Sequence, residues 1–156
     1  MSYKERYGQW LNDEFFDEAT RKELEAITDE KEIEDRFYRD LEFGTGGLRG
    51  VMGAGTNRMN KYTVGKATMG LGRYLLDTYG AEACKNRGVV IGYDTRNNSE
   101  FFSRTAANVL SGMGIRVYLH AHALKDRVRI ISLLRISEMA GTIRLRLRSA
   151  TTGKSV

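Results

Sequence analysis

The feature that most constrains this chain is a strand–helix–strand alternation in its second half. The segment GVVIGYD, residues 88–94, is a continuous apolar run that ends in polar residues, which is typical of a strand buried on both faces. A helix is expected to follow a cap at Asn98 or Ser99, and IRVYLH, residues 115–120, is expected to be the next strand. Two strands joined through a helix in this way predict a parallel pair with a crossover helix.

A second helix is expected before that unit. Asn60 is its predicted N-cap and Gly80 its predicted C-cap. Its apolar face consists of Val64, Ala67, Leu71 and Leu75. A short strand around Leu48 to Met52 precedes it. The resulting order predicts a three-layer α/β/α domain with a mostly parallel sheet that is incomplete at its C-terminus.

The first 42 residues have a different, helical pattern. Residues 11–42 are expected to be helical, with Thr28 as an N-cap and acidic residues in the turn after it. Ile33, Phe37 and Leu41 recur every four residues and form one apolar stripe. We expect residues 1–42 to be a helical lead-in to the α/β domain.

Composition limits the class of protein. At 156 residues, with 41% hydrophobic and 29% charged residues, the chain fits one globular domain. It has no run near the roughly 20 apolar residues of a membrane span, and its N-terminus has no signal-peptide pattern. The single cysteine, Cys84, excludes an internal disulfide framework. These features predict a cytoplasmic protein without a membrane partner.

Charge divides the chain at residue 120. Residues 1–120 hold 17 Lys and Arg against 18 Asp and Glu, whereas residues 121–156 hold 8 against 2. All 15 Phe, Trp and Tyr precede residue 121, and the chain has no proline. We therefore expect three parts: the lead-in at 1–42, an α/β/α domain at 43–120, and a basic tail at 121–156.

Two segments are candidates for binding chemistry. FGTGGLRG begins a run of six glycines between Gly44 and Gly55, and its exposed amides together with the planar fork of Arg49 suit an anion. The alternative is a tight turn with a solvated arginine. GYDTRNN follows the predicted strand, where ligands bind in open parallel sheets. Asp94 and Arg96 could serve such a site, or form a local ion pair or a helix cap.

Nucleotide-binding motifs do not account for these segments. A Rossmann fingerprint needs glycines between a strand and a helix, and here a helix comes before the glycines and a strand after them. SATTGKS near the end is not a Walker A loop, because Arg148 stands where its first glycine is required.

Together the two segments resemble one family. FGTGGLRG, then IGYDTRNNSEFFSRTAANVLSGMGIRVYL, with the lead-in EIEDRFYRDLEF, is similar to the first domain of the α-D-phosphohexomutases over about residues 7–120. The closest branch is phosphoglucomutase/phosphomannomutase. The resemblance implies an isomerase, an intramolecular phosphotransferase of carbohydrate metabolism with four domains around one cleft. A phosphoserine, Mg²⁺ and glucose 1,6-bisphosphate would move phosphate between the 1- and 6-positions of a hexose.

The resemblance also implies site residues. Thr45 and Arg49 would support catalysis beside the phosphoserine, and Arg49 would steady the phosphoryl group. The substrate phosphate would be bound by Gly46, Gly47, Arg49, Asp94 and Arg96.

The chain departs from the family pattern after His120. The family's Thr-Ala-Ser-His-Asn loop and its Asp-x-Asp-x-Asp magnesium loop are not readable, so no metal ligand is assigned. The serines of this part are not in the catalytic context; they are Ser132, Ser137, Ser149 and Ser155. His120 and His122 are not assigned a role either. We expect the chain to be an N-terminal fragment that is inactive by itself on hexose phosphates.

Three interpretations of the tail stay open. Family-like DNA translated in the wrong frame would explain the missing proline, the lost aromatics and the charge jump together, since codons for Ala150 to Thr152 can give Ser-His-Asn in another frame. TIRLRLR could instead be an edge strand, with Ile143, Leu145 and Leu147 facing a core. A small phosphate- or nucleic-acid-binding module is the third, but arginines without aromatic stacking residues make nucleic acid an unexpected partner.

Overall fold

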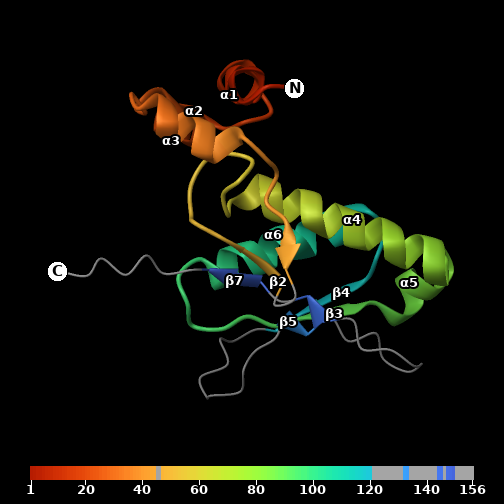
Figure 1. Cartoon of the computed structure of the whole chain (residues 1–156). Helices are drawn as coiled ribbons and strands as arrows, with labels where there is room; N and C mark the ends of the chain where they lie inside the picture. The colour runs from red at the N-terminus through yellow and green to blue at the C-terminus, as the bar shows by residue number, and fades with distance from the viewer. Residues whose placement is uncertain (45–46, 121–131, 134–143, 146, 150–156) are drawn as a thin grey trace.

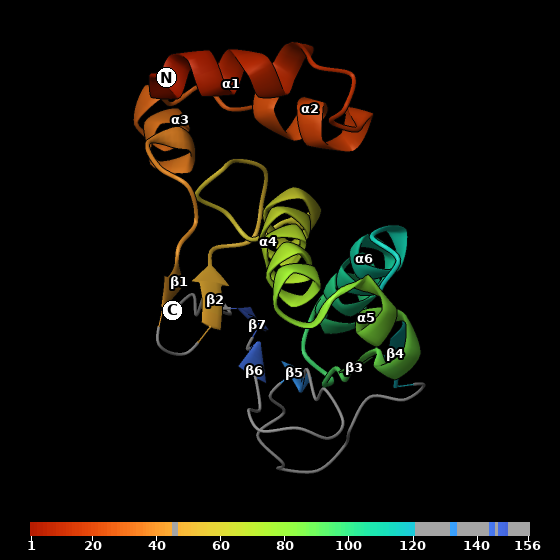
Figure 2. The same ribbon diagram turned by 90° about the vertical axis from the view of Figure 1, so that its right-hand side faces the viewer.

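The computed structural model describes residues 1–44, 47–120, 132–133, 144–145 and 147–149. Three short helices form the N-terminal part of the molecule, above the rest of the chain in Figures 1 and 2. They are α1 (Tyr3–Asn12), α2 (Glu18–Glu25) and α3 (Glu30–Phe37).

Each lead-in helix begins at its own cap. Ser2 and Glu5 form a capping box at α1, and the Asp17 side chain accepts a hydrogen bond from the Thr20 amide at α2. The prediction of Thr28 as an N-cap is wrong by one residue. The N-cap of α3 is Asp29, whose side chain accepts a hydrogen bond from the Lys31 amide. Aspartate is the stronger N-cap of the two neighbouring residues.

The expected apolar stripe is also shorter than its spacing indicated. Helix α3 ends at Phe37, so Leu41 lies beyond it and packs in a different cluster, against Leu48 and Met59. Phe37 belongs to a lead-in core with Trp10, which packs edge-to-face against it.

Aromatic contacts join the lead-in to the rest of the molecule. Trp10 stacks on Phe16 with ring centroids 4.2 Å apart, and Tyr62 packs edge-to-face on Trp10 at 5.5 Å. Tyr62 lies in the first turn of α4 (Lys61–Tyr79), so this cluster seats the lead-in on the start of that helix.

The predicted caps of α4 are confirmed. The Asn60 side chain accepts hydrogen bonds from the amides of Tyr62 and Thr63, and the helix ends at Gly80, whose φ of 79° favours glycine. A short helix, α5 (Ala81–Arg87), follows directly.

The parallel pair is confirmed. Strand β3 (Val89–Ile91) pairs with β4 (Val117–Leu119), and α6 (Ser99–Gly112) forms the crossover. Helices α4 and α6 lie on one side of this pair in Figures 1 and 2. The apolar core between them contains Leu75, Cys84, Val89, Ile91, Ala106, Leu110 and Ile115.

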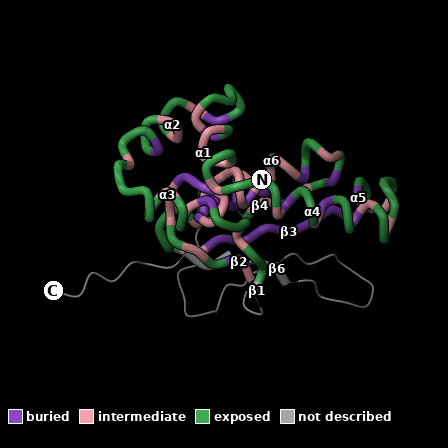
Figure 3. Tube along the Cα trace, turned by 45° about the horizontal axis from the view of Figure 1, so that its top comes forward, coloured by how far each residue is buried: buried purple, intermediate pink, exposed green. Residues whose placement is uncertain are grey.

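Strand β3 is buried on one face, so the expected burial on both faces is wrong. Figure 3 shows the buried stretch along β3. Val89 and Ile91 face the helices, whereas Val90 is 40% exposed and its partner Tyr118 is 49% exposed. Alternate residues of a strand face opposite sides, and α4 and α6 cover only one of them.

The glycine-rich segment forms a hairpin. Strand β1 (Phe43–Gly44) pairs antiparallel with β2 (Gly47–Gly50), which ends two residues earlier than the expected strand. On its other edge β2 pairs in parallel with β7 (Leu147–Ser149).

The tail contains two more short strands, β5 (Ser132–Leu133) and β6 (Arg144–Leu145), which pair antiparallel. Strand β7 lies at the edge of its sheet, but β6 belongs to a different sheet, so the TIRLRLR segment is not the single edge strand that was one of the expectations. Ile143 lies outside the described residues, so the expected inward stripe stays a prediction.

Candidate functional site

The β1–β2 hairpin exposes Arg49. Leu48 is 1% exposed and enters a core cluster, so the next residue of the strand points the opposite way. Gly47, at the start of β2, has a φ of 93°, which favours glycine. No ion pair or hydrogen bond engages the Arg49 side chain within the part of the chain that is described, so its five guanidinium N–H donors are available to an anion. Thr45 and Gly46, predicted to lie beside it, are outside the described residues.

The second candidate segment folds around an ion pair. The Asp94 carboxylate accepts hydrogen bonds from the Arg96 amide at 3.1 Å and from Arg96 Nε at 2.6 Å. The Asp94 amide in turn donates to Ser99 Oγ at 3.1 Å, at the start of α6. The local ion pair left open by the sequence is therefore present.

Arg96 lowers the pKa of the Asp94 carboxyl group. Partial burial raises the pKa of Asp94, but the hydrogen bonds from Arg96 and Ser99 outweigh it and hold that pKa below its ordinary value of 3.8. Asp94 is therefore ionised at neutral pH. It neutralises part of the Arg96 charge and fixes the direction of its guanidinium.

The loop and the first turns of α6 line an open groove of about 480 Å³. Its lining consists of Tyr93, Asp94, Thr95, Arg96, Asn98, Glu100, Phe101 and Arg104. Asn98 adopts a left-handed conformation with a φ of 61°, so the chain turns sharply into the helix here. The amino end of a 14-residue helix favours negative charge.

Sequence reasoning missed the helical part of this groove. Phe101 is 50% exposed, and Arg104 pairs with Glu100 at 2.9 Å, one turn earlier in the helix. The spacing of Phe101 and Arg104, five and eight residues after Arg96, would have placed them in the first two turns of the predicted helix.

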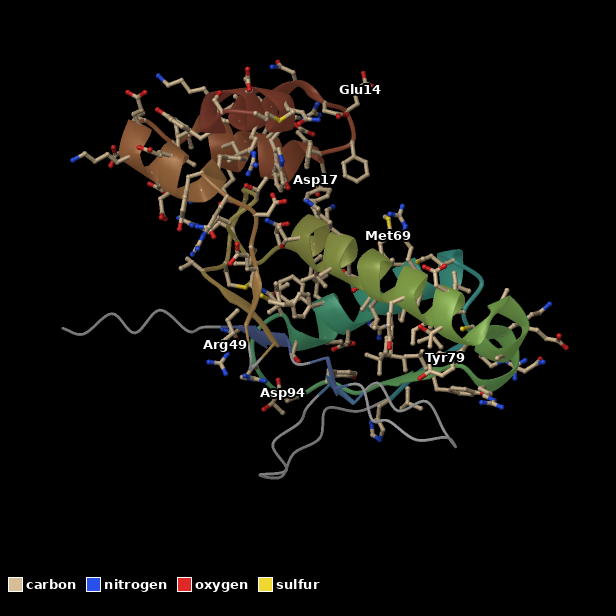
Figure 4. All side chains as sticks on the ribbon, turned by 45° about the vertical axis from the view of Figure 1, so that its right-hand side comes forward. Glu14, Asp17, Arg49, Met69, Tyr79 and Asp94 are labelled. Carbon is tan, nitrogen blue, oxygen red and sulfur yellow. The ribbon has the colours of Figure 1, made fainter. Side chains whose placement is uncertain are left out.

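The structure brings Asp94 and Arg96 together and leaves Arg49 on a separate element. In Figure 4 the labelled Arg49 and Asp94 lie in the same region of the view, away from Asp17 of the lead-in and Tyr79 at the end of α4. No hydrogen bond or ion pair between described residues joins Arg49 to the Asp94–Arg96 pair.

The described residues do not form a metal site or a reactive thiol. Across the residues that the structure describes, no three His, Cys, Asp or Glu side chains converge as a metal site would require. Cys84 is buried, and burial raises the pKa of its thiol, which disfavours the nucleophilic thiolate. Ser137, Ser155 and His122 lie outside the described residues. None of the helices in the described part is both long and apolar enough to cross a membrane.

Comparison with known proteins decides the family. The profile described as "Phosphoglucomutase/phosphomannomutase, alpha/beta/alpha domain I" matches residues 40–128, more than half of the chain. The chain belongs to the phosphoglucomutase/phosphomannomutase family. The match includes both the Arg49 hairpin and the Asp94–Arg96 loop. The family and the α/β/α fold class expected from the sequence are both confirmed.

Individual relatives are phosphomutases of several kinds. The chain is 36% identical to a phosphoglucomutase of Staphylococcus epidermidis over 112 residues, which are 72% of this chain and 19% of that protein. It is 34% identical to a probable phosphoribomutase of Schizosaccharomyces pombe, over 86% of this chain and 24% of that protein. A mouse phosphopentomutase is 40% identical over 63% of this chain and 16% of its own length.

The chain therefore spans about a fifth of the length of these relatives, in their first domain. No solved structure matches it.

Proposed function

We propose that the chain supplies domain I of a phosphohexomutase-type enzyme, which interconverts hexose 1-phosphate and hexose 6-phosphate. The observation that carries this proposal is the family match over residues 40–128, which includes an exposed arginine and a groove lined by two more arginines. Hexose phosphate is the proposed substrate class, in cytoplasmic carbohydrate metabolism. The relatives named phosphopentomutase and phosphoribomutase make pentose phosphate the competitor to test.

Arg49 is the proposed phosphate ligand of the hairpin. Its planar guanidinium suits two phosphoryl oxygens at once and would stabilise charge that shifts among them during transfer. Thr45, Gly46 and Gly47 would line the same phosphate, the glycines by letting backbone amides approach it. This role follows from the exposure of Arg49 and from the likeness of the loop to the family motif.

Asp94 and Arg96 are the proposed second contact. The ion pair holds the Arg96 guanidinium in the groove at the start of α6, where the helix end adds partial positive charge. Arg96 would bind a phosphate oxygen, and Asp94 would keep its side chain oriented.

Magnesium and the phosphoserine belong to the same proposal at the level of the whole enzyme. The described residues contain no cluster of three carboxylate, imidazole or thiol ligands, so their donors do not fit a Mg²⁺ site. We assign no step of the reaction to a metal on this part of the chain. Glucose 1,6-bisphosphate is the proposed activating intermediate, and it carries two phosphates that could reach both arginines.

Activity of this chain alone is expected to be absent. Positioning and electrostatic stabilisation supply most of the acceleration in phosphoryl transfer, and the chain spans about a fifth of its relatives. Purified residues 1–156, given Mg²⁺ and glucose 1,6-bisphosphate, should not convert glucose 1-phosphate in a coupled assay. Turnover that follows this polypeptide through purification would contradict the expectation.

Binding tests the proposal directly. Calorimetric titration with glucose 1,6-bisphosphate should show weak binding that Arg49→Ala abolishes. Arg73→Ala, which removes an exposed arginine of α4 outside the groove, is the matched control and should bind like the unchanged chain. Equal binding by the Arg49→Ala variant would contradict the role of Arg49.

Two further titrations compare ligand classes. Ribose 5-phosphate binding more tightly than glucose 6-phosphate would move the proposed substrate to pentoses. Tight, salt-dependent binding of an oligonucleotide, lost on deleting residues 121–156, would favour the binding-module alternative.

A further inference from the structure

The β1–β2 hairpin is fixed at its base by residues 53–59, a loop that folds back against the lead-in helices. Before the hairpin, the Leu41 amide donates to the Thr56 carbonyl at 2.8 Å. After it, the Met59 amide donates to the Val51 carbonyl at 2.8 Å. Both ends of the hairpin are therefore tied to the same loop.

One ion pair of the lead-in holds the middle of this loop. The Ala54 amide donates to Glu23 Oε1 at 3.0 Å, and Arg36 Nη1 donates to the Ala54 carbonyl at 3.0 Å. Arg36 Nη1 also donates to the same Glu23 oxygen at 2.6 Å. The Arg36 side chain is only 13% exposed and Ala54 is 2% exposed. The amide and the carbonyl of Ala54 are thus both bound by the Glu23–Arg36 pair.

The loop also closes the carboxyl end of α3. The Asn57 amide donates to the Arg36 carbonyl at 2.9 Å, which satisfies one of the last carbonyls of the helix. Gly55 has a φ of 129°, and a Cβ at this position would lie 2.8 Å from the same carbonyl oxygen. Helix and loop approach so closely here that a side chain would force them apart.

These contacts connect the lead-in to the candidate site. Glu23 and the whole of α3 lie before residue 40, where the family match begins. Figure 2 shows the hairpin extending from the loop away from the lead-in helices. Hydrogen bonds to the backbone of the 53–59 loop therefore connect the lead-in to the hairpin that carries Arg49.

We infer that Glu23 and Arg36 are positioning residues for Arg49. Their hydrogen bonds to the Ala54 backbone set the place of the 53–59 loop, and that loop sets the base of the hairpin from which Arg49 projects. The inference rests on the proposed role of Arg49 as a phosphate ligand. It predicts that loss of the Glu23 carboxylate loosens the hairpin while the α4–α6 core stays intact.

Amide hydrogen exchange on the full chain, followed by NMR, tests this inference. Glu23→Ala should accelerate exchange at the Leu41 and Met59 amides and in β2 by about tenfold, with little change in α6. Glu23→Gln keeps an oxygen that can accept from Ala54, so it should restore much of the protection. Glu18→Ala is the matched control, since Glu18 lies on the same helix and pairs with Lys22 in solvent.

The exchange pattern decides the outcome. Faster exchange confined to Ala54, with β2 unchanged, would overturn the inference, as would equal acceleration throughout α6 and β4. An identical pattern for Glu23→Gln and Glu23→Ala would show that hydrogen bonding to Ala54 is not what holds the loop, which would also overturn it.

A titration with inorganic phosphate separates this inference from the proposed function. Glu23→Ala should bind phosphate several-fold more weakly than the unchanged chain, and Glu18→Ala should bind equally. If the unchanged chain shows no phosphate response, the proposed role of Arg49 fails. The amide exchange of the hairpin then still decides whether Glu23 and Arg36 position it.

Discussion

The arginines where the lead-in meets the 53–59 loop and those of the candidate site differ in how far their side chains are buried. Arg36 and Arg58 have side chains 13% and 9% exposed, and each donates to both a backbone carbonyl and a carboxylate. The exposed side chain of Arg49 has no partner among the described residues, and that of Arg96 is 40% exposed and pairs with Asp94 alone among them. The same type of side chain joins separate elements of the fold in one region, and in the other it is the phosphate ligand that we propose. Substitutions should therefore affect stability in the first region and binding in the second.

The largest expected effect is on Arg36. Arg36→Met keeps the apolar stem but leaves the Ala54 carbonyl without its donor and takes the cation away from the Glu23 carboxylate. Loss of such a largely buried, charged donor should lower the free energy of unfolding by about 2–4 kcal/mol. Urea denaturation measures it, with Arg73→Met as the exposed control. A loss no larger than that of the control would contradict the structural role of Arg36.

A smaller loss of stability is expected when Arg58 is replaced. Arg58 donates to the Asp35 carbonyl at 3.3 Å and to its carboxylate at 2.5 Å. The Asp35 side chain is 61% exposed, so water can solvate it when the arginine is gone. Arg58→Met should therefore lower the free energy of unfolding by about 1–2 kcal/mol. A loss that exceeds that of the Arg36 variant in the same urea series would break the ranking.

At the candidate site the stability effect should be close to zero. Arg49→Ala removes an exposed side chain without a described partner, so the free energy of unfolding should change by no more than about 0.5 kcal/mol. Its binding of glucose 1,6-bisphosphate should nevertheless be lost. If the variant unfolds readily, Arg49 belongs with the structural arginines and the comparison fails.

The smallest effect concerns the acid dependence of the Asp94–Arg96 pair. The pKa of Asp94 in the folded chain lies below its ordinary value of 3.8. A lowered folded pKa means that the contribution to stability is present above that ordinary value and is lost as pH falls through the lower folded value. Asp94→Asn should be slightly less stable than the unchanged chain at neutral pH, and the two should converge in acid. Urea midpoints across pH measure this, and a constant difference would contradict the assignment.

Local signals in the sequence predicted most of the elements. Asn60 and Gly80 cap α4 through bonds and dihedral angles within a few residues, so each could be predicted from its neighbours. The parallel β3–β4 pair followed from the order of strands and helices. The error between Thr28 and Asp29 arose because two cap-forming residues stand side by side.

Contacts between distant residues could not be predicted. Glu23 reaches Ala54 across 31 positions, and its partner there is a backbone amide, which has no signature in the sequence. Arg36 was indistinguishable from the other charged residues of an amphipathic helix. The exposure of Val90 depends on which side of the sheet the helices occupy, and an apolar run does not encode that.

The site was predicted in part, for the same reason. Asp94 and Arg96 are two residues apart, so their ion pair was a possibility that the sequence could state. Whether the Arg49 hairpin and the Asp94 loop bind one ligand depends on their relative positions in the fold. The sequence does not encode those positions locally, because the two elements are more than 40 residues apart.

The most direct test of the account is a footprint of glucose 1,6-bisphosphate on the amide resonances of the full chain. If the hairpin and the groove form one phosphate site, the resonances of residues 47–50 and 94–98 should shift together, with one dissociation constant, and both sets of shifts should disappear in Arg49→Ala. Shifts in only one of the two segments, or shifts that persist unchanged without Arg49, would show that the hairpin and the groove do not form a single phosphate site.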